Sequence, residues 1–344
     1  MTRRRMGFAR WRSQLPSGGN RYDEELATGL EALGMDVHEY PVSGSWPVPE
    51  QHDRQRIAEM LTSENDWMIG NIVGSAVPEA IATAVAAGRR VTMVVHYFPA
   101  DDPGLSSTDR ERLAASERLA VHAASTIVAT SAWAAGEVSR RYGRDDAVVA
   151  VPGVDPANLA LGSAPAGQPP MLLWLGRLTR AKDPRTFVDA LARLQDLDWT
   201  AHLVGPDSLD EDLNRTVRDR IAETGLAGRV DVPGSRVGEA LEAVWARTDL
   251  LVHTSRSETY GMVVSEALAR GIPSIVASGT GAVEAQGVGE MFPPGDVAAL
   301  ADALRVWLGD PALQRRWRAE AADLRAHLPT WQRTVEIFAS ALPG

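Results

Sequence analysis

Short apolar segments alternate with amphipathic segments along the whole chain, and this alternation limits the possible folds more than any other feature. In the first half, the apolar segments indicate strands at 5–11, 36–42, 67–71, 90–96 and 126–130. The segments between and after them favour helices at 20–33, 51–63, 78–87, 108–124 and 132–142. Apolar strands that alternate with helices build parallel sheets whose two faces are both covered.

The same pattern starts again after segment 164–170, which is rich in proline and marks a domain boundary. Strands are expected at 171–175, 200–204, 230–232, 250–253 and 274–276, and helices at 183–194, 209–224, 237–247 and 261–270. A length of 344 residues suits two such domains. We therefore predict an α/β fold with two doubly wound parallel-sheet domains, 1–163 and 164–329. They are expected to face across a cleft that binds ligands at the carboxyl ends of the strands.

Composition argues against several classes of function. The net charge of −10 disfavours general nucleic-acid binding, which depends on clustered cations. The absence of cysteine excludes disulfides, thiolate catalysis and zinc sites of the cysteine type. No apolar run is long enough to span a bilayer, and no apolar core follows the basic N-terminal residues. A cytoplasmic protein is therefore expected.

Lys182 is the only lysine among the 35 cationic residues of the chain. It ends the segment Gly176-Arg177-Leu178-Thr179-Arg180-Ala181-Lys182, which lies between a predicted strand and a predicted helix. A glycine turn there exposes backbone at the sheet edge, and Arg177 and Lys182 can extend from its two ends. Two fixed cations suit a diphosphate leaving group, whose negative charge they would stabilise. A pair of solvated loop charges is the alternative interpretation.

A second segment in the same strand–loop–helix context contains Glu258 in the loop and Glu266 in the second turn of the helix. A helix advances ~9 Å from residue 260 to residue 266, which is about the span from the sugar to the ribose of a nucleotide sugar. A carboxylate can accept hydrogen bonds from a ribose diol. The helix N-terminus supplies free amides for phosphate or sugar oxygens, those of Tyr260, Gly261, Met262 and Val263. A solvated helix face with two unrelated glutamates is the alternative.

Two glycines end predicted strands at the same sheet edge. They lie in Val204-Gly205-Pro206 and Pro233-Gly234-Ser235-Arg236. Such turns suit backbone contacts to a nucleobase, although ordinary connections between strands and helices have the same composition.

Taken in order, these segments resemble the C-terminal domain of family 4 glycosyltransferases, which have the GT-B fold. The resemblance covers residues 171 to about 310. It is carried by Leu175-Gly176-Arg177-Leu178 with Lys182, Val204-Gly205, Pro233-Gly234, Ser255-x-x-Glu258-x-x-Gly261 and Glu266-Ala267-Leu268-Ala269-x-Gly271-Ile272-Pro273. In the first half, Ser17-Gly18-Gly19 and Val151-Pro152-Gly153-Val154-Asp155 resemble the same family more weakly.

The resemblance implies a role for each matching residue. By position, Arg177 and Lys182 would bind the diphosphate, and Glu266 would bind the ribose. Glu258 would contact the donor sugar or lie near the reacting face. His96 follows a predicted strand and resembles the histidine of the N-terminal domain that faces the sugar, with a structural histidine as the alternative.

The resemblance also implies features of the whole chain. The two domains would be Rossmann-like, and the final helix, 330–344, would pack on the first of them. The reaction would retain the anomeric configuration without a metal. Gly18 and Gly19 would contact the donor. Asp183 stands where the family usually has glycine, which bears on the local turn, although aspartate is a favourable helix cap.

Two Asp-x-Asp patterns match the motif of metal-dependent transferases, but we attribute both to solvated charge. Asp196-Leu197-Asp198 precedes Trp199 in a loop, and Asp210-Glu211-Asp212 is expected on an exposed helix face. Neither lies at a strand end that faces the expected cleft. No catalytic metal and no bound cofactor are therefore expected.

The implied reaction moves a hexosyl group from a nucleotide diphosphate sugar to a hydroxyl group. A UDP-sugar ranks before a GDP-sugar on frequency in the family alone. A small soluble acceptor is favoured, because the aromatic segment 95–99 could line a compact pocket. The first 21 residues hold six arginines and no acid, so a lipid acceptor on an anionic membrane is an alternative. The same fold would also suit phosphorolysis of a disaccharide, epimerisation of a nucleotide sugar, or an inactive subunit that only binds a nucleotide sugar.

Overall fold

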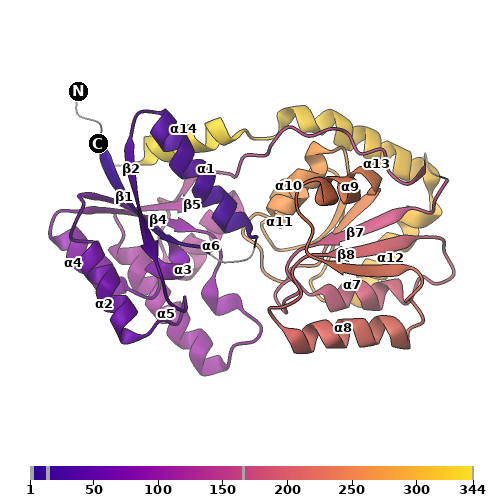
Figure 1. Ribbon diagram of the computed structural model, residues 1–344, viewed down its shortest axis with the longest axis horizontal. Coiled ribbons are helices and arrows are strands. Elements are labelled where there is room, and N and C mark those ends of the chain that lie inside the picture. Colours follow the sequence, from indigo (N-terminus) through magenta and orange to yellow (C-terminus); the bar gives the residue numbers. More distant parts are fainter. Residues whose placement is uncertain (1–3, 13–15, 165–166, 343–344) are drawn as a thin grey trace. The chain divides into compact units, whose positions relative to one another are not determined.

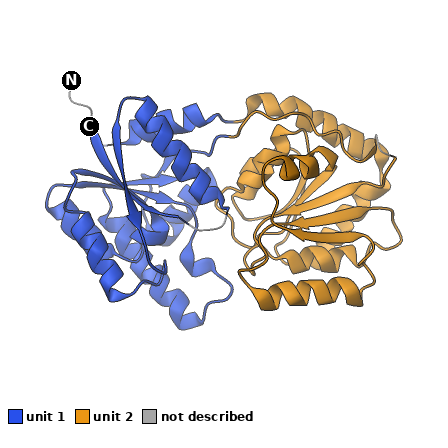
Figure 2. Cartoon of the chain, viewed as in Figure 1, with its two compact units in different colours: residues 1–153, 329–344 blue, residues 154–328 orange. Residues whose placement is uncertain are grey.

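The computed structural model describes residues 4–12, 16–164 and 167–342 and divides the chain into two compact units. Unit 1 comprises residues 1–153 and 329–344, and unit 2 comprises residues 154–328 (Figure 2). Each unit contains one six-stranded parallel sheet surrounded by helices (Figure 1). The predicted fold class, an α/β protein with two doubly wound parallel sheets, is confirmed.

The unit 1 sheet has the strand order β2-β1-β3-β4-β5-β6. Its strands are β1 (Arg5–Trp11), β2 (Asp36–Val42), β3 (Asp66–Gly70), β4 (Arg90–Val95), β5 (Thr126–Ala129) and β6 (Val148–Val149). The chain passes from β1 to β2 on one side and then returns to β3 on the other side of β1. This reversal creates a switch point between β1 and β3, where open α/β sheets bind ligands.

Serine and threonine side chains cap several helices of unit 1. The helices are α1 (Gly18–Ala32), α2 (Gln51–Met60), α3 (Asn71–Gly74), α4 (Pro78–Ala86), α5 (Ser107–Ala123), α6 (Ala132–Tyr142) and α14 (Trp331–Ala341), with a 3-10 turn at Pro99–Asp101. Ser17 accepts a hydrogen bond from the backbone amide of Asn20, so α1 begins two residues earlier than predicted. Thr330 caps α14 in the same way.

The last helix, α14, packs on unit 1, as the resemblance implies. Figure 1 shows α14 in yellow alongside α1 in indigo. The apolar side chains of Val335, Phe338 and Leu342 are buried in one cluster with Leu26 and Leu30 of α1. The C-terminal segment therefore completes the core of the first unit across a long sequence separation.

The unit 2 sheet has the order β12-β11-β10-β7-β8-β9, which is the Rossmann order. Its strands are β7 (Met171–Leu175), β8 (Thr200–Val204), β9 (Val230–Gly234), β10 (Leu250–His253), β11 (Ser274–Ala277) and β12 (Gly289–Phe292). The reversal of strand order lies between β7 and β10. Strand β12 was not predicted, because it is a partly exposed edge strand of mixed polarity.

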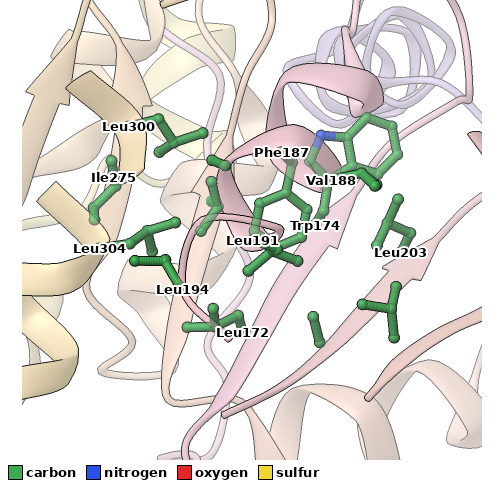
Figure 3. Close-up of a cluster of buried hydrophobic side chains, with 14 of the residues drawn as sticks. Leu172, Trp174, Phe187, Val188, Leu191, Leu194, Leu203, Ile275, Leu300 and Leu304 are labelled. Atoms are coloured by element: carbon green, nitrogen blue, oxygen red, sulfur yellow. The ribbon is translucent and has the colours of Figure 1, made fainter. Parts of the chain in front are cut away.

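Helices cover both faces of this second sheet. They are α7 (Pro184–Leu191), α8 (Glu211–Glu223), α9 (Glu239–Arg247), α10 (Met262–Ala269), α11 (Ala282–Gln286), α12 (Val297–Gly309) and α13 (Pro311–Leu324), with a 3-10 turn at Arg325–His327. In Figure 1, α7, α8 and α12 lie on one face, and α9, α10 and α13 lie on the other. Figure 3 shows part of the core on the first face, which includes Leu172, Trp174, Phe187, Val188, Leu191 and Ile275. Each such side chain contributes ~1.5–3 kcal/mol when fully buried.

The division between the units lies after Gly153, whereas the proline-rich segment predicted it after residue 163. Segment 157–163 is held by unit 2. Ala160 N donates to Arg270 O at 2.9 Å, and the amides of residues 161 and 162 both donate to Ala246 O at 2.9 Å. The Asp249 carboxylate accepts from the next amide, that of Ser163. These backbone bonds join the segment to unit 2 before the proline-rich stretch is reached.

Candidate functional site

The carboxyl ends of β7 and β10 lie side by side at the switch point of unit 2. Arg177 and Lys182 follow β7, and Glu258 follows β10. Parallel strands end at the same edge of a sheet, so the topology brings together side chains that are 76 positions apart in the sequence. This edge is the place where Rossmann-like sheets bind ligands.

Glycines shape the turns along this edge. Gly176 N donates to Val204 O at 3.0 Å, and Gly205 has a φ of 151°. A Cβ atom at Gly205 would lie 1.8 Å from Gly176 O, so only glycine allows the two turns to approach this closely. Gly234, with a φ of 75°, accepts a hydrogen bond from Gly205 N at 3.1 Å. Both glycines therefore shape the edge, and their contact with a nucleobase stays a prediction.

Asp183 holds the turn that follows Lys182. Its φ of 49° makes it the one non-glycine residue with a left-handed backbone in the described part of the chain. Its carboxylate accepts from Thr186 N at 3.3 Å and from Thr186 Oγ1 at 2.7 Å, and it pairs with Arg256 Nε at 2.7 Å. Aspartate tolerates this conformation better than most residues because its short side chain bonds locally. Asp183 therefore keeps a turn suited to glycine and also caps α7.

Thr254 ties the turn after β7 to the end of β10. Its buried Oγ1 lies 2.9 Å from Lys182 O and 2.8 Å from Asp183 O and donates to these carbonyls. The same oxygen accepts from Trp174 Nε1 at 2.8 Å. This network fixes the backbone of Lys182 next to the loop that carries Glu258.

Three donor groups converge on one oxygen of Glu258. Lys182 Nζ forms an ion pair with Glu258 Oε2. His253 Nε2 lies 3.3 Å from this oxygen without a well-directed hydrogen bond, and Ser255 Oγ lies 3.4 Å from it. Among the described residues, none donates to the other oxygen, Oε1. Oε2 is therefore held by neighbouring side chains, whereas Oε1 is held by none of the described residues.

The charges of this cluster follow from burial and pairing. Burial would raise the pKa of Glu258, but Lys182 and His253 outweigh it and hold the pKa well below its ordinary value. Burial lowers the pKa of His253, and the Lys182 charge lowers it further against the opposing effect of Glu258. The cluster therefore contains an ammonium, a carboxylate and a neutral imidazole.

The N-terminus of α10 presents backbone donors beside this cluster. The amides of residues 260–263 donate to no acceptor in the part of the chain that the structure describes. Gly261, with a φ of 83°, is the N-cap residue. The Tyr260 side chain is buried, and burial raises its pKa to about 12, so its hydroxyl is neutral. Glu266 shares the half-buried face of α10 with Met262 and Val263.

Arg177 lies half-buried in the turn that follows β7. No ion pair of its guanidinium exists within the described ranges of the chain. The predicted donor residues from Arg177 to Glu266 therefore lie on loops and one helix that meet at one sheet edge of unit 2. Their contacts with a nucleotide sugar remain predictions.

His96 belongs to a separate group of polar residues in unit 1. It follows β4, and its Nε2 lies 2.9 Å from Asp23 Oδ1. Its ring packs edge-on against Tyr22, with centroids 5.4 Å apart. A Cβ atom at Gly19 would lie 3.7 Å from His96 Cγ, so the start of α1 lies against the imidazole at Gly19. The structure thus brings the predicted glycine turn and the predicted histidine together.

Four residues that support these two groups were not predicted from the sequence. Asp23 and Asn71 hold His96, the latter by accepting from His96 N at 2.9 Å. His253 and Thr254 hold Glu258 and Lys182. The sequence could have indicated two of them, because Asn71 and His253 are polar residues at the ends of apolar strands. Asp23 carried a weaker signal, as an acid beside the apolar face of α1.

Neither Asp-x-Asp segment belongs to these groups. Asp196 is exposed and pairs with both terminal nitrogens of Arg305, at 2.5 and 3.0 Å. Asp210 caps α8 and accepts from Leu213 N at 2.9 Å. Within the described ranges, no three His, Asp or Glu side chains are close enough together to hold a metal ion. No helix among these residues has the length and apolar character needed to cross a membrane.

Comparison with known proteins identifies the class. Residues 162–324 match the family described as "Glycosyl transferases group 1", and this match contains the unit 2 cluster. The sucrose-phosphate synthase of Thermosynechococcus elongatus superposes with a TM-score of 0.81 at 18% identity, covering 98% of both chains. HepE of Anabaena, in complex with UDP and glucose, superposes with a TM-score of 0.75 at 20% identity, covering 98% of this chain and 99% of that one. The chain therefore has the GT-B fold and carries a glycosyl transferases group 1 domain.

The relatives that are most similar in sequence include several enzymes of one kind. The D-inositol 3-phosphate glycosyltransferase of Jonesia denitrificans is 31% identical over 259 residues, which is 68% of this chain and 60% of that enzyme. The chain spans less than two thirds of the length of the first relatives of this kind.

Proposed function

We propose that this chain is a glycosyltransferase that moves a hexosyl group from a nucleoside diphosphate sugar to a hydroxyl group of a small soluble acceptor. One observation carries the proposal. Among the described residues, the switch point of a group 1 domain gathers an ammonium, a carboxylate with one oxygen that accepts no hydrogen bond, and a helix N-terminus whose amides donate to no acceptor. Scattered solvated charges, the competing interpretation, would not explain why these groups meet.

The diphosphate would lie against Arg177, Lys182 and the amides of residues 260–263. Two cations and a helix N-terminus are suited to the negative charge that grows on a departing diphosphate. Such groups can replace a metal ion in this role, so we propose a reaction that needs none.

The sugar and the ribose would meet the two glutamates. Glu258 is ionised, and its Oε1 can accept a hydrogen bond from a sugar hydroxyl. Glu266 lies in the second turn of α10, where it can accept from the ribose diol. Helix α10 begins at Met262, so it advances ~6 Å to Glu266, less than the ~9 Å expected for a helix that starts at residue 260.

We propose that transfer retains the anomeric configuration, as in the family that the sequence resembles. The bond between the anomeric carbon and the diphosphate oxygen breaks, and the bond to the acceptor oxygen forms on the same face of the sugar. The acceptor proton passes to the departing phosphate oxygen. His96, oriented by Asp23, would face the sugar while these bonds break and form.

The order of the candidate donors and acceptors follows from similar proteins and from the composition of the N-terminal segment. UDP is placed before GDP, and the complex of HepE with UDP and glucose supports that order. A phosphorylated cyclitol is a reasonable first acceptor to test, because the relatives that match are named D-inositol 3-phosphate glycosyltransferases. A lipid acceptor is the second candidate, which the arginines of the first 21 residues favour.

The test is acceptor-dependent release of UDP from UDP-glucose, measured with an inositol phosphate, with simple sugars and with EDTA present. Transfer that persists in EDTA is expected. Release that needs inorganic phosphate would indicate phosphorolysis, a changed sugar without release would indicate epimerisation, and binding without turnover would indicate an inactive subunit. Lys182→Ala should lower turnover at least ~100-fold. Arg180→Ala, which changes an exposed cation of the same loop, is the matched control.

A further inference from the structure

The Lys182 ammonium already has a partner within the chain. Its partner is Glu258 Oε2, and both side chains are mostly buried, with exposed fractions of 22% and 15%. If Lys182 binds a diphosphate, the phosphate oxygens compete with Glu258 for the ammonium and weaken this ion pair. Glu258 would then remain as a mostly buried carboxylate with a weakened counter-charge, which is costly.

His253 is placed to compensate for that loss. It is the last residue of β10, and its backbone is paired with Val276 of β11, so it stays in place when Lys182 moves. Its Nε2 is 3.3 Å from Glu258 Oε2. In the described part of the chain, this buried nitrogen has no well-formed hydrogen bond to any other group.

We propose that His253 is a positioning residue that becomes the main hydrogen-bond donor to Glu258 Oε2 when Lys182 turns to the donor diphosphate. This inference rests on the proposed function, since it requires a diphosphate at Lys182. The exchange moves no proton. The imidazole is neutral because it is buried, and the adjacent carboxylate favours the tautomer that carries the proton on Nε2.

The exchange has a functional consequence. Glu258 would remain ionised and fixed through Oε2 in both states, so that Oε1 keeps its direction toward the sugar. Without His253, binding of the diphosphate would leave Glu258 poorly compensated, and part of the binding free energy would be lost.

The first test compares UDP affinity, measured by titration calorimetry, in three variants. His253→Phe should bind UDP at least about tenfold more weakly than wild type, the scale of one hydrogen bond to a charged group. His253→Gln should stay within about threefold, because its amide nitrogen can reach the place of Nε2. His202→Phe is the matched control, since His202 is a half-buried histidine of neighbouring β8 that lies outside the cluster. Equal affinity in His253→Phe and wild type would overturn the inference.

The second test uses the fact that Lys182 is the only lysine of the chain. Protein labelled with ¹³C and ¹⁵N in lysine gives a single Cε signal, free of overlap with other lysines. UDP should shift this signal in wild type and in His253→Gln. A signal that does not move when UDP is bound would mean that the ion pair persists, and the exchange would be wrong.

A third comparison separates this inference from the proposed function. In the Glu258→Gln background, the neutral amide needs no counter-charge, so His253→Phe should change UDP affinity by less than about twofold. An undiminished effect would show that His253 acts only on local structure. If wild type binds neither UDP nor GDP, the proposed function itself is wrong. If wild type binds UDP and the His253 variants bind it equally well, only the proposed role of His253 is wrong.

Discussion

At the scale of single residues, the ion pair between Lys182 and Glu258 contributes to the stability of the folded chain. The pKa of Glu258 in the folded chain lies below its value in an unfolded chain, which is about 4.3. A depressed pKa stabilises the folded state fully above that unfolded value. The contribution is lost as pH falls through the folded pKa.

Lys182→Met should therefore change how stability depends on pH. Without the ammonium, the largest effect that lowers the pKa of Glu258 is removed. Because burial still raises this pKa, it should be higher than in wild type. We expect a loss of about 2 kcal/mol near neutral pH, less than the ~3–5 kcal/mol of fully buried pairs because both groups are partly exposed. Below pH ~4 the difference from wild type should shrink. Thermal unfolding from pH 3 to 7 measures this, with Arg180→Met as the control, and a constant difference across that range would contradict it.

Glu266→Ala addresses the proposed ribose contact. Loss of hydrogen bonds to a charged group should weaken nucleotide binding by ~1.5–3 kcal/mol. UDP and UDP-glucose should lose affinity equally, because the ribose is common to both. The measurement is a pair of binding titrations. If only the sugar donor binds more weakly, the proposed roles of Glu266 and Glu258 are exchanged.

At the scale of elements, the contact between α1 and α14 depends on Gly29. A Cβ atom at this position would lie 2.3 Å from Val335 Cγ2. Gly29→Ala should thus destabilise the protein by ~1–2 kcal/mol, because overpacking outweighs the gain in helix propensity. Gly136→Ala in α6 meets nothing within 4 Å and should instead stabilise by ~0.5–1 kcal/mol.

Chemical denaturation of the two alanine variants checks the contact. Adding Val335→Ala to Gly29→Ala should recover part of the loss, since it removes the atoms that clash. Opposite signs for Gly29→Ala and Gly136→Ala are the expected pattern. A stabilising Gly29→Ala would mean that α14 does not pack closely on α1.

Element boundaries show where sequence patterns suffice. The strands at 5–11, 36–42, 171–175, 200–204 and 250–253 have the predicted bounds, because apolar runs end where breakers begin. The five-residue helix α11 carries too short a pattern to be recognised, and strand β12 is partly exposed and of mixed polarity. Helix α12 is different, because Leu300, Leu304 and Trp307 follow the helical period. This helix was not predicted, although the sequence pattern was sufficient to indicate it.

At the scale of the whole molecule, the chain passes between the units twice, after Gly153 and after Leu328. Removal of all residues after Pro329 deletes α14 and leaves unit 2 whole. The deletion should expose the apolar surface that Val335, Phe338 and Leu342 cover, and transfer should be lost. UDP affinity should stay within about threefold, because the proposed nucleotide site lies in unit 2. Transfer rate and UDP affinity, measured together, test this, and unimpaired transfer by a soluble truncation would contradict it.

The sequence by itself determined the alternation of strands and helices and the fold class with two sheets. It also determined that Arg177, Lys182, Glu258 and Glu266 lie in loops that follow strands or in the helix after such a loop. These are local properties, since apolar periodicity and turn residues act over a few positions. Only the tertiary structure decided that segment 154–163 belongs to unit 2 and that His253, Thr254 and Asp23 hold the candidate residues. Strand order sets such contacts, because pairing of β7 with β10 joins segments separated by more than seventy residues. A polar residue at the end of an apolar strand reveals its partner only when the neighbouring strand is known.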